Sequence, residues 1–564
     1  MRKMCRAAPA VIVCGGIVAG LSGSLAQAQP TAGQIEKQFA VPPAPLSKPG
    51  LAIPQFDPLL PPPAAAQVTF RLQRVDLVGN TVLSTAELAT AYQGLIGKDV
   101  SVAQLFGIAN AITSLYGKDG YSLSRAIVPA QQIDGSGTIR IRIVEGFVDQ
   151  VKVEGKAPPN PLIVAQAKKI EADRPISNRT LERYLLLSND LPGVTAHSVL
   201  KKSDTTFGAT TVVLDVEPTK PFQGTFSIDN RGSHAVGPLE LDLGLSYANL
   251  LGPNSETSLR LVNASLDREL YYLTLQHKMV LNSEGTTLSF GLRASKSHPG
   301  TLTFTNIDLV TSATTGFVEL RHPVIRSRNL NLQAYTSFDV RNEQTDTLGS
   351  PLSRDRLRVL RVGLDFDQTD SHGGLNTANL QLSKGIGALG ASPDGDPLSS
   401  RAAGKPDFTK LTLDASRTQS LGVFDPKLAA WSLYGKATAQ FTGDPLLSSE
   451  QCSLGGSDYG RAFDASTLSG DRCAGATVEV RYDVAHPGKL NSLQFYSFYD
   501  VGWAATLTPG ASTQSANFAS AGLGARFAFL DRYSASIEVA KQLRLTGGTP
   551  DSYPRLFVSL SGRF

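Results

Sequence analysis

Histidine and cysteine, the side chains that most often bind metals, are few in this sequence, with seven and four residues, and they are widely spaced. The seven histidines have no metal-ligand spacing, and no Ser/His/Asp arrangement stands out. They are His197, His234, His277, His298, His322, His372 and His486. The segment 385–390 formally fits G-x-G-x-x-G, but it opens no helix whose N-terminus could bind a phosphate. The sequence therefore predicts neither an enzyme nor a cofactor or metal site.

The most informative part of the sequence is a glycine-rich segment, residues 454–464, which reads LGGSDYGRAFD. Its candidate functional residues are Gly455, Gly456, Asp458, Tyr459, Gly460, Arg461 and Phe463. The glycines allow tight turns. An arginine that such a hairpin carries into a protein interior must regain its hydrogen bonds, and a carboxylate can accept its planar guanidinium in a bidentate way. The segment could therefore fix a loop by an ion pair; the alternative is that Arg461 is a solvated charge.

Two cysteines, Cys452 and Cys473, flank this segment. The other two, Cys5 and Cys14, lie in a predicted signal peptide, so the mature chain keeps an even pair in an oxidising compartment. We expect a disulfide that closes the loop and stabilises it by about 3 kcal/mol through the entropy of the unfolded chain. Free thiols are the alternative.

Residues 1–28 have the pattern of a secretory signal peptide. Arg2, Lys3 and Arg6 precede an apolar stretch, and residues 26–28 supply an A-x-A cleavage pattern. The stretch is too short for a comfortable membrane anchor, and Cys14 lacks the small residues that precede a lipidated cysteine. No later segment is an apolar run of transmembrane-helix length, so the exported chain is either soluble or a β-barrel. Net charge is +4, three of it in the signal peptide, which does not suggest nucleic-acid binding.

From residue 220 to residue 564 the sequence alternates between apolar and polar residues, most clearly over 239–247. We count sixteen such segments, starting near 224, 239, 257, 271, 287, 316, 331, 356, 376, 408, 430, 475, 493, 520, 532 and 554. Connections after odd-numbered segments include the long ones, above all 442–474, and the chain ends in Phe564, a typical last residue of outer-membrane barrels. Asp500 has the parity opposite to Tyr499 and Val501, so it should face the lumen. The pattern favours a 16-stranded antiparallel transmembrane β-barrel over a soluble β-helix or sandwich.

The region before the barrel divides into a linker and two small α/β units. Residues 29–66 contain one short helix-compatible stretch, 33–38, and many prolines. Residues 67–146 and 147–219 each follow the order β-α-α-β-β. In the first unit, a strand is expected over 68–78, and Ser84 with Glu87 has the spacing of a capping box.

Several short motifs lie at 119–129 with Gln131 or Gln132, at 144–146, at 151–155, at 229–233 and at 249–252. Together with the segment 454–464, they resemble the two-partner secretion transporters (TpsB), the haemolysin secretion/activation group with ShlB, FhaC and HecB, in the superfamily that includes BamA. The resemblance implies that the two units are periplasmic POTRA domains. It also implies that the loop at 442–474, loop six, folds back into the barrel, where Arg461 contacts Asp500 on strand thirteen.

Two features leave parts of this resemblance open. Relatives usually have Gly-Tyr after Gly-Arg in loop six, whereas this chain has Ala462 and Phe463 after Arg461. In addition, Glu479 or Asp483 could replace Asp500 as the partner of Arg461. In relatives, a helix at the position of residues 34–39 can plug the barrel. Here the helix is short and its linker is rich in proline, so either outcome is open.

The function that the resemblance implies is export across the bacterial outer membrane. The POTRA domains would bind an unfolded exoprotein, such as a haemolysin or adhesin, by strand addition, and the barrel would pass it outward. Further expected partners are outer-membrane lipids and the barrel assembly machinery, but no nucleic acid. One alternative is insertion of other barrels into the membrane, although such proteins typically carry more docking domains. A passive porin would leave the docking domains unexplained.

Overall fold

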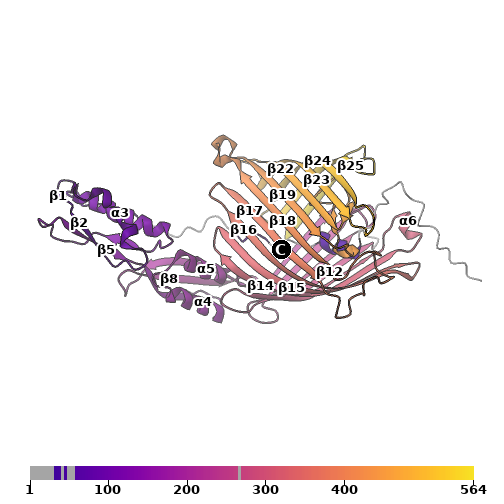
Figure 1. Cartoon of the computed structure of the whole chain (residues 1–564), viewed down its shortest axis with the longest axis horizontal. Helices are drawn as coiled ribbons and strands as arrows, with labels where there is room; N and C mark the ends of the chain where they lie inside the picture. The colour runs from indigo at the N-terminus through magenta and orange to yellow at the C-terminus, as the bar shows by residue number, and fades with distance from the viewer. Residues whose placement is uncertain (1–30, 40–43, 47–56, 265–268) are drawn as a thin grey trace, which may run out of the picture.

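The computed structural model describes residues 31–39, 44–46, 57–264 and 269–564, and the predicted signal peptide lies outside them. A barrel occupies one side of an elongated molecule, and two small α/β units extend from it in a row (Figure 1). No helix in these residues is long and apolar enough to cross a membrane.

Sixteen strands form a closed antiparallel barrel, in which β26 pairs back onto β9. They are β9 (Phe222–Asp229), β10 (Glu240–Ala248), β11 (Ser255–Ala264), β12 (Leu270–Val280), β13 (Thr287–Ser297), β14 (Val310–Arg326), β15 (Leu330–Thr347), β16 (Ser350–Thr369), β17 (Gly374–Gly385), β18 (Thr409–Ser420), β19 (Trp431–Thr442), β22 (Arg472–Asp483), β23 (Ser492–Thr506), β24 (Gln514–Phe529), β25 (Tyr533–Leu545) and β26 (Arg555–Arg563). The predicted fold class, strand number and antiparallel closure are confirmed. A closed barrel leaves no strand edge facing lipid, and an even number of strands lets the last strand pair antiparallel with the first.

The alternation in the sequence becomes two chemically different faces of the barrel. Apolar residues such as Leu241, Leu292, Leu382 and Val478 are exposed on the outer face, whereas their polar neighbours point inward. Phe564 continues this outer face: its ring contacts that of Phe222, and its backbone N–H and C=O both pair with Gly224. The terminal residue thus extends the seam that closes the barrel.

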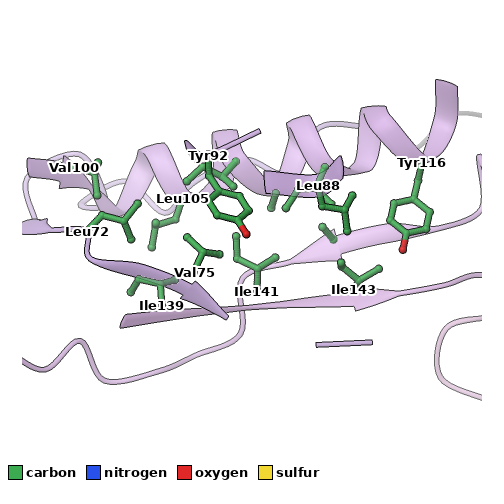
Figure 2. Packing of buried hydrophobic residues seen from close by; sticks show 14 residues of the cluster. Leu72, Val75, Leu88, Tyr92, Val100, Leu105, Tyr116, Ile139, Ile141 and Ile143 are labelled. Atoms are coloured by element: carbon green, nitrogen blue, oxygen red, sulfur yellow. The ribbon is translucent and has the colours of Figure 1, made fainter. Parts of the chain in front are cut away.

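The first α/β unit contains β1 (Thr69–Arg71), β2 (Arg74–Val78), α2 (Thr85–Ala89), β3 (Asp99–Ser101), α3 (Val102–Lys118), β4 (Arg125–Ile127) and β5 (Thr138–Val144). Its three-stranded sheet has the order β2-β5-β4, and α3 packs on one face through Leu105 and Tyr116 (Figure 2). The predicted Ser84–Glu87 capping box is present at α2.

The prediction of a single strand over residues 68–78 is wrong. The chain turns at Leu72, which is fully buried and donates to Lys98, so β1 pairs with β3 while β2 joins the sheet.

Glu145, which follows β5, ties the first unit together. Its carboxylate accepts hydrogen bonds from the backbone and hydroxyl of Thr81, from Val82 N–H and from the Tyr116 hydroxyl. Burial alone would raise the pKa of Glu145, but these hydrogen bonds lower it below its usual value. The negative charge is therefore part of the folded unit.

Replacing Glu145 by glutamine should destabilise this unit by about 1–2 kcal/mol near neutral pH, because an amide cannot accept all of these donors. Since folding lowers the pKa of Glu145, its stabilisation is complete above the unfolded pKa of about 4.3 and is lost as the pH falls below that value. Calorimetric unfolding of the full-length protein should therefore show a lower unfolding temperature of this unit for Glu145→Gln than for wild type. The difference in unfolding temperature should shrink as the pH is lowered. A difference independent of pH would contradict this explanation.

The second unit contains β6 (Phe147–Glu154), α4 (Pro161–Ala172), α5 (Asn178–Asn189), β7 (Val194–Lys202) and β8 (Ala209–Pro218), with the sheet order β6-β8-β7. It lies against the turns at one end of the barrel. Arg326 pairs with Asp190 at 2.7 Å, and the Tyr184 hydroxyl donates to Glu284 at 3.0 Å. These contacts join the second unit directly to the barrel.

Candidate functional site

The loop between β19 and β22 contains η4 (Ser448–Glu450), β20 (Cys452–Leu454) and β21 (Leu468–Gly470), and its tip lies against the inner barrel wall. Tyr459 and Phe463 are buried, and the Phe463 ring stacks on Phe518 of β24 with centroids 4.7 Å apart. At Gly460, where φ is +81°, a Cβ atom would lie 2.5 Å from Phe518. Glycine is therefore required there both by the backbone conformation and by the close approach.

Arg461 is the centre of a buried polar cluster on the wall. Its guanidinium donates to Asp500 at 3.1 and 3.3 Å, to Glu479 at 2.6 Å and to Thr477 at 2.6 Å, and its backbone N–H donates to Asp500 at 2.9 Å. The guanidinium also lies 3.7 Å from the ring centroid of Phe498. Asp500 thus binds both the side chain and the backbone of the residue at the loop tip.

The sequence left three carboxylates open as partners of Arg461, and the structure shows which of them it contacts. The structure brings Arg461 together with both Asp500 and Glu479, while Asp483 accepts from Gln494 instead. Ala462, where relatives usually have glycine, is fully buried, and its carbonyl accepts from Gln542. With alanine at this position, Arg461 pairs with both Glu479 and Asp500.

Two further loop-six carboxylates have partners. Asp458 pairs with Lys436 of β19 at 2.9 Å and is largely exposed. Asp464 pairs with Arg555 of β26 at 2.7 Å and with His234 at 2.8 Å. Sequence reasoning missed the partners of Asp464, because they lie far away in the chain and belong to no motif.

The predicted disulfide joins Cys452 of β20 to Cys473 of β22. Cys473 is part of the barrel wall, so the bond fastens the base of the loop to the wall. The closed ring contains Arg461 and the hairpin of β20 with β21.

Replacing both cysteines by serine should destabilise loop six by about 3 kcal/mol, because the open loop gains conformational entropy. Limited proteolysis of the membrane-inserted protein should then cut within residues 453–472 faster than in wild type. A reductant should reproduce this effect in wild type and change nothing in the double variant. Equal cleavage of the two proteins would show that the bond does not hold the loop.

Helix α1 (Ala32–Gln38) lies inside the barrel, far from the other N-terminal elements (Figure 1). Glu36 pairs with Arg341 of β15 at 2.6 Å and accepts from Thr315 of β14. On an adjoining face of α1, the buried side chains of Ile35 and Phe39 pack on the inner wall formed by β11 and β12. The question that the sequence left open is thereby answered: this helix occupies the lumen.

Helix α1 and loop six are also in direct contact. Lys37 donates to Gln451 O at 2.7 Å, and Gln34 donates to Ser469 at 3.0 Å. At Gly33, an added Cβ would lie 2.4 Å from the Cβ of Ser449, so the helix approaches η4 closely. The two segments lie side by side in the lumen.

Glu450 joins this assembly to the wall. It is fully buried and pairs with Lys410 of β18 at 2.7 Å and with Arg361 of β16 at 2.8 Å, while Arg341 lies 3.8 Å away. Because Arg341 also binds Glu36, one network connects η4, α1 and three barrel strands. Nothing in the sequence marked Glu450, since it lies outside the loop-six motif.

Beside α1 and loop six, the lumen retains a cavity of about 830 Å³. Most of the residues that line it are polar or charged, among them Arg260, Arg293, Asp339, Gln381, Asp414 and Gln440. In the described part of the chain, no cluster of His, Cys, Asp and Glu has the arrangement of a metal site.

A polar lumen inside a closed barrel with an apolar outer face, occupied in part by two segments of its own chain and preceded by α/β units, defines an outer-membrane β-barrel transporter. The family model of the haemolysin secretion/activation protein ShlB/FhaC/HecB matches residues 208–527, and the ShlB-type POTRA domain model matches residues 70–146. The chain belongs to this family of haemolysin secretion/activation proteins.

Individual relatives agree with this assignment. The heme/hemopexin transporter protein HuxB of Haemophilus influenzae strain 86-028NP is 25% identical over 493 residues, which cover 85% of this chain and 84% of HuxB. The outer membrane transporter CdiB of Dickeya dadantii is 25% identical over 447 residues, 77% of this chain and 76% of its own length. The solved structure of CdiB from Escherichia coli has the same fold, with a TM-score of 0.71 and 20% identity over 92% of this chain and 94% of CdiB.

Proposed function

We propose that this protein is the export pore of a two-partner secretion system, which takes up an unfolded exoprotein in the periplasm and passes it through the barrel. The observation that carries the proposal is a polar-walled barrel filled by α1 and loop six, both held by ion pairs and hydrogen bonds. Such bonds can be exchanged for bonds to water or to a passing polypeptide. Movement of one or both segments would open the path.

The edge strand β7 of the second unit is the proposed binding site for the exoprotein. Thr219 N–H donates to Gly193 O, and Ser203 N–H donates to Ala209 O, so the odd-numbered residues of β7 face β8. The backbone groups of Ser198, Leu200 and Lys202 therefore point outward, and they have no partner among the described residues. An extended client can add a strand there through backbone hydrogen bonds, which make little demand on its sequence.

The remaining assignments follow from this role. Residues 1–28 would be removed during export of the transporter itself, which would reach the membrane through the barrel assembly machinery. The apolar outer face would contact outer-membrane lipids. Most lumen carboxylates described above are engaged by arginine or lysine, which favours a pore lining over catalysis, and neither nucleic acid nor a cofactor has a role. Folding of the exported chain outside the cell would remove it from the equilibrium and give the transport its direction.

The test is secretion of the large exoprotein encoded in the adjacent reading frame. Cells that express both proteins should release the exoprotein into the medium, and deletion of the transporter should retain it in the periplasm. Ser198→Pro, which removes an outward N–H from β7, should reduce release, whereas Val199→Thr on the same strand should not. Conductance in planar bilayers without any secretion would indicate a porin, and loss of other outer-membrane barrels on deletion would indicate an assembly factor.

A further inference from the structure

The hairpin of β15 and β16 rises above the membrane on the side away from the POTRA units. Arg326, at the end of β14, pairs with Asp190 of the second unit, so the turn between β15 and β16 lies at the opposite, extracellular end. The 20 residues of β16, at about 3.3 Å each and a tilt of about 40°, rise about 50 Å. The apolar band of such a barrel is about 25 Å tall, so a large part of β16 lies outside the hydrocarbon.

The outward face of β16 changes from apolar to basic toward the extracellular end. Leu364 and Leu360 are exposed apolar residues of this face, and outward positions alternate along a strand. Arg358 comes next, but it is buried and donates to backbone carbonyls of the loop that follows β17. Arg356 and Arg354 follow on the same face, about 10 and 15 Å above Leu360, and both are exposed. These two arginines therefore lie at and above the level of the lipid headgroups.

A third cation lies on the same outer face, on β13. Lys296 is exposed and lies four residues beyond Leu292, an exposed apolar residue on the outward face of that strand. In the register of the sheet, Lys296 is opposite Ser312 of β14. Gln344 of β15 comes next in this row, between Ser312 and Arg354. Since neighbouring strands are about 4.8 Å apart, the backbones of the lysine and the arginine are about 14 Å apart, with polar side chains between them.

The protein does not neutralise this basic patch, which consists of Lys296, Arg354 and Arg356. In the described part of the chain none of the three forms an ion pair, whereas the arginines of β15 and β16 that face the lumen pair with carboxylates. Asp346, the next outward residue of β15, accepts from the Gln344 amide at 2.7 Å. The patch thus presents positive charge to whatever lies beside the barrel at this level.

We propose that the basic patch binds the phosphate groups of lipid A, the phosphorylated glycolipid of the outer leaflet, whose acyl chains then lie along the apolar face below. The proposal rests on the contact with outer-membrane lipids proposed above. A guanidinium presents a planar pair of N–H donors that fits a phosphate group. Lipid A carries a phosphate at each end of its disaccharide, so one molecule can engage the arginines and the lysine on opposite sides of the patch. A phospholipid with one phosphate can engage only one side.

The position of the patch favours this lipid over other anionic partners. The residues of β15 and β16 that alternate with it, such as Glu343 and Asp355, are buried on the lumen side of the sheet. An exported polypeptide in the lumen is therefore separated from the patch by the barrel wall. A free phosphate could contact the cations but would make no use of Leu292 and Leu360 below them. Acyl chains joined to phosphates match the order of apolar and basic residues on this face.

The test is the binding of bisphosphorylated lipid A to the purified full-length protein in detergent, measured by native mass spectrometry. Wild type should bind this lipid, and the variant Arg354→Gln/Arg356→Gln should bind it about 30-fold more weakly, which is about fivefold for each arginine. Both side chains are exposed, so the variant should fold, and the heat-modifiable mobility of its barrel verifies this. Lys427→Gln/Lys489→Gln, which removes two exposed cations from turns at the periplasmic end, is the matched control and should bind like wild type.

Three other ligands identify the source of the phosphate. Lipid A without its phosphates should bind wild type and the arginine variant equally weakly, and phosphatidylglycerol should bind wild type more weakly than lipid A does. Inorganic pyrophosphate should not displace lipid A, because it lacks acyl chains. The proposal is overturned if wild type and the arginine variant bind lipid A equally, if phosphatidylglycerol binds wild type as tightly as lipid A, or if pyrophosphate displaces the lipid. Binding of lipid A without its phosphates reports the lipid contact itself, so a failure of the basic patch is distinguished from a failure of that contact.

Discussion

Replacement of Arg461 by alanine is expected to abolish export of the exoprotein while the barrel still assembles in the outer membrane. The substitution leaves Asp500 buried without its guanidinium partner, which costs about 3–5 kcal/mol, whereas Glu479 keeps its pairs with Arg481 and Arg526. That amount shifts an equilibrium between loop conformations by about 100-fold or more. Because the sixteen strands pair independently of the loop tip, the cost falls on the position of loop six. Secretion into the medium and the heat-modifiable mobility of the barrel are the two measurements.

Lys436→Ala is the matched control for this prediction. It also removes a cation that pairs with a loop-six carboxylate, but Asp458 is mostly exposed, so its loss should cost little. Arg461→Lys should be nearly as defective as alanine, since an ammonium group cannot replace the fork that joins Asp500, Glu479 and Thr477. Normal export by Arg461→Ala would show that this cluster is not needed for transport.

The barrel could be predicted from the sequence because its physics is local. Each strand must place apolar residues toward lipid and polar residues toward the lumen, so a period of two persists from Phe222 to Arg563. The predicted strand starts lie within a few residues of the observed ones for most strands. The main errors are at β14, β16 and β24, which begin earlier than expected because these strands extend past the alternating part of the sequence.

The lumen could be predicted only where a motif marked it. The loop-six segment stood out through its glycines, and the alternation showed that Asp500 faces inward. Glu450 had no such mark, because its partners Lys410 and Arg361 lie 40 and 89 residues away in the chain. The position of α1 was equally hidden, since a seven-residue helix with one buried glutamate reads the same in a linker as in a pore.

Deletion of residues 32–39 should turn the partly occupied lumen into an open, conducting channel. The barrel sheet itself should stay closed. The segment fills the lumen beside loop six, and its removal eliminates the Glu36–Arg341 ion pair, the Lys37 hydrogen bond and the packing of Ile35 and Phe39. The space that α1 leaves adjoins the existing cavity of about 830 Å³, so water and ions gain a continuous polar path. Planar-bilayer recordings should show a severalfold higher and steadier conductance than wild type.

Smaller changes at the same helix should give a graded response. Glu36→Gln keeps the shape of the side chain but removes its charge, which weakens the hold of Arg341 and should produce brief openings rather than a permanently open pore. Arg321→Ala is the control, because Arg321 pairs with Glu319 and Asp365 on the wall and makes no ion pair with α1 or loop six.

If the deletion left the conductance at the wild-type level, loop six alone would close the pore. The helix would then not contribute to closing the pore, and opening of the pore would depend on the Glu450 and Arg461 clusters.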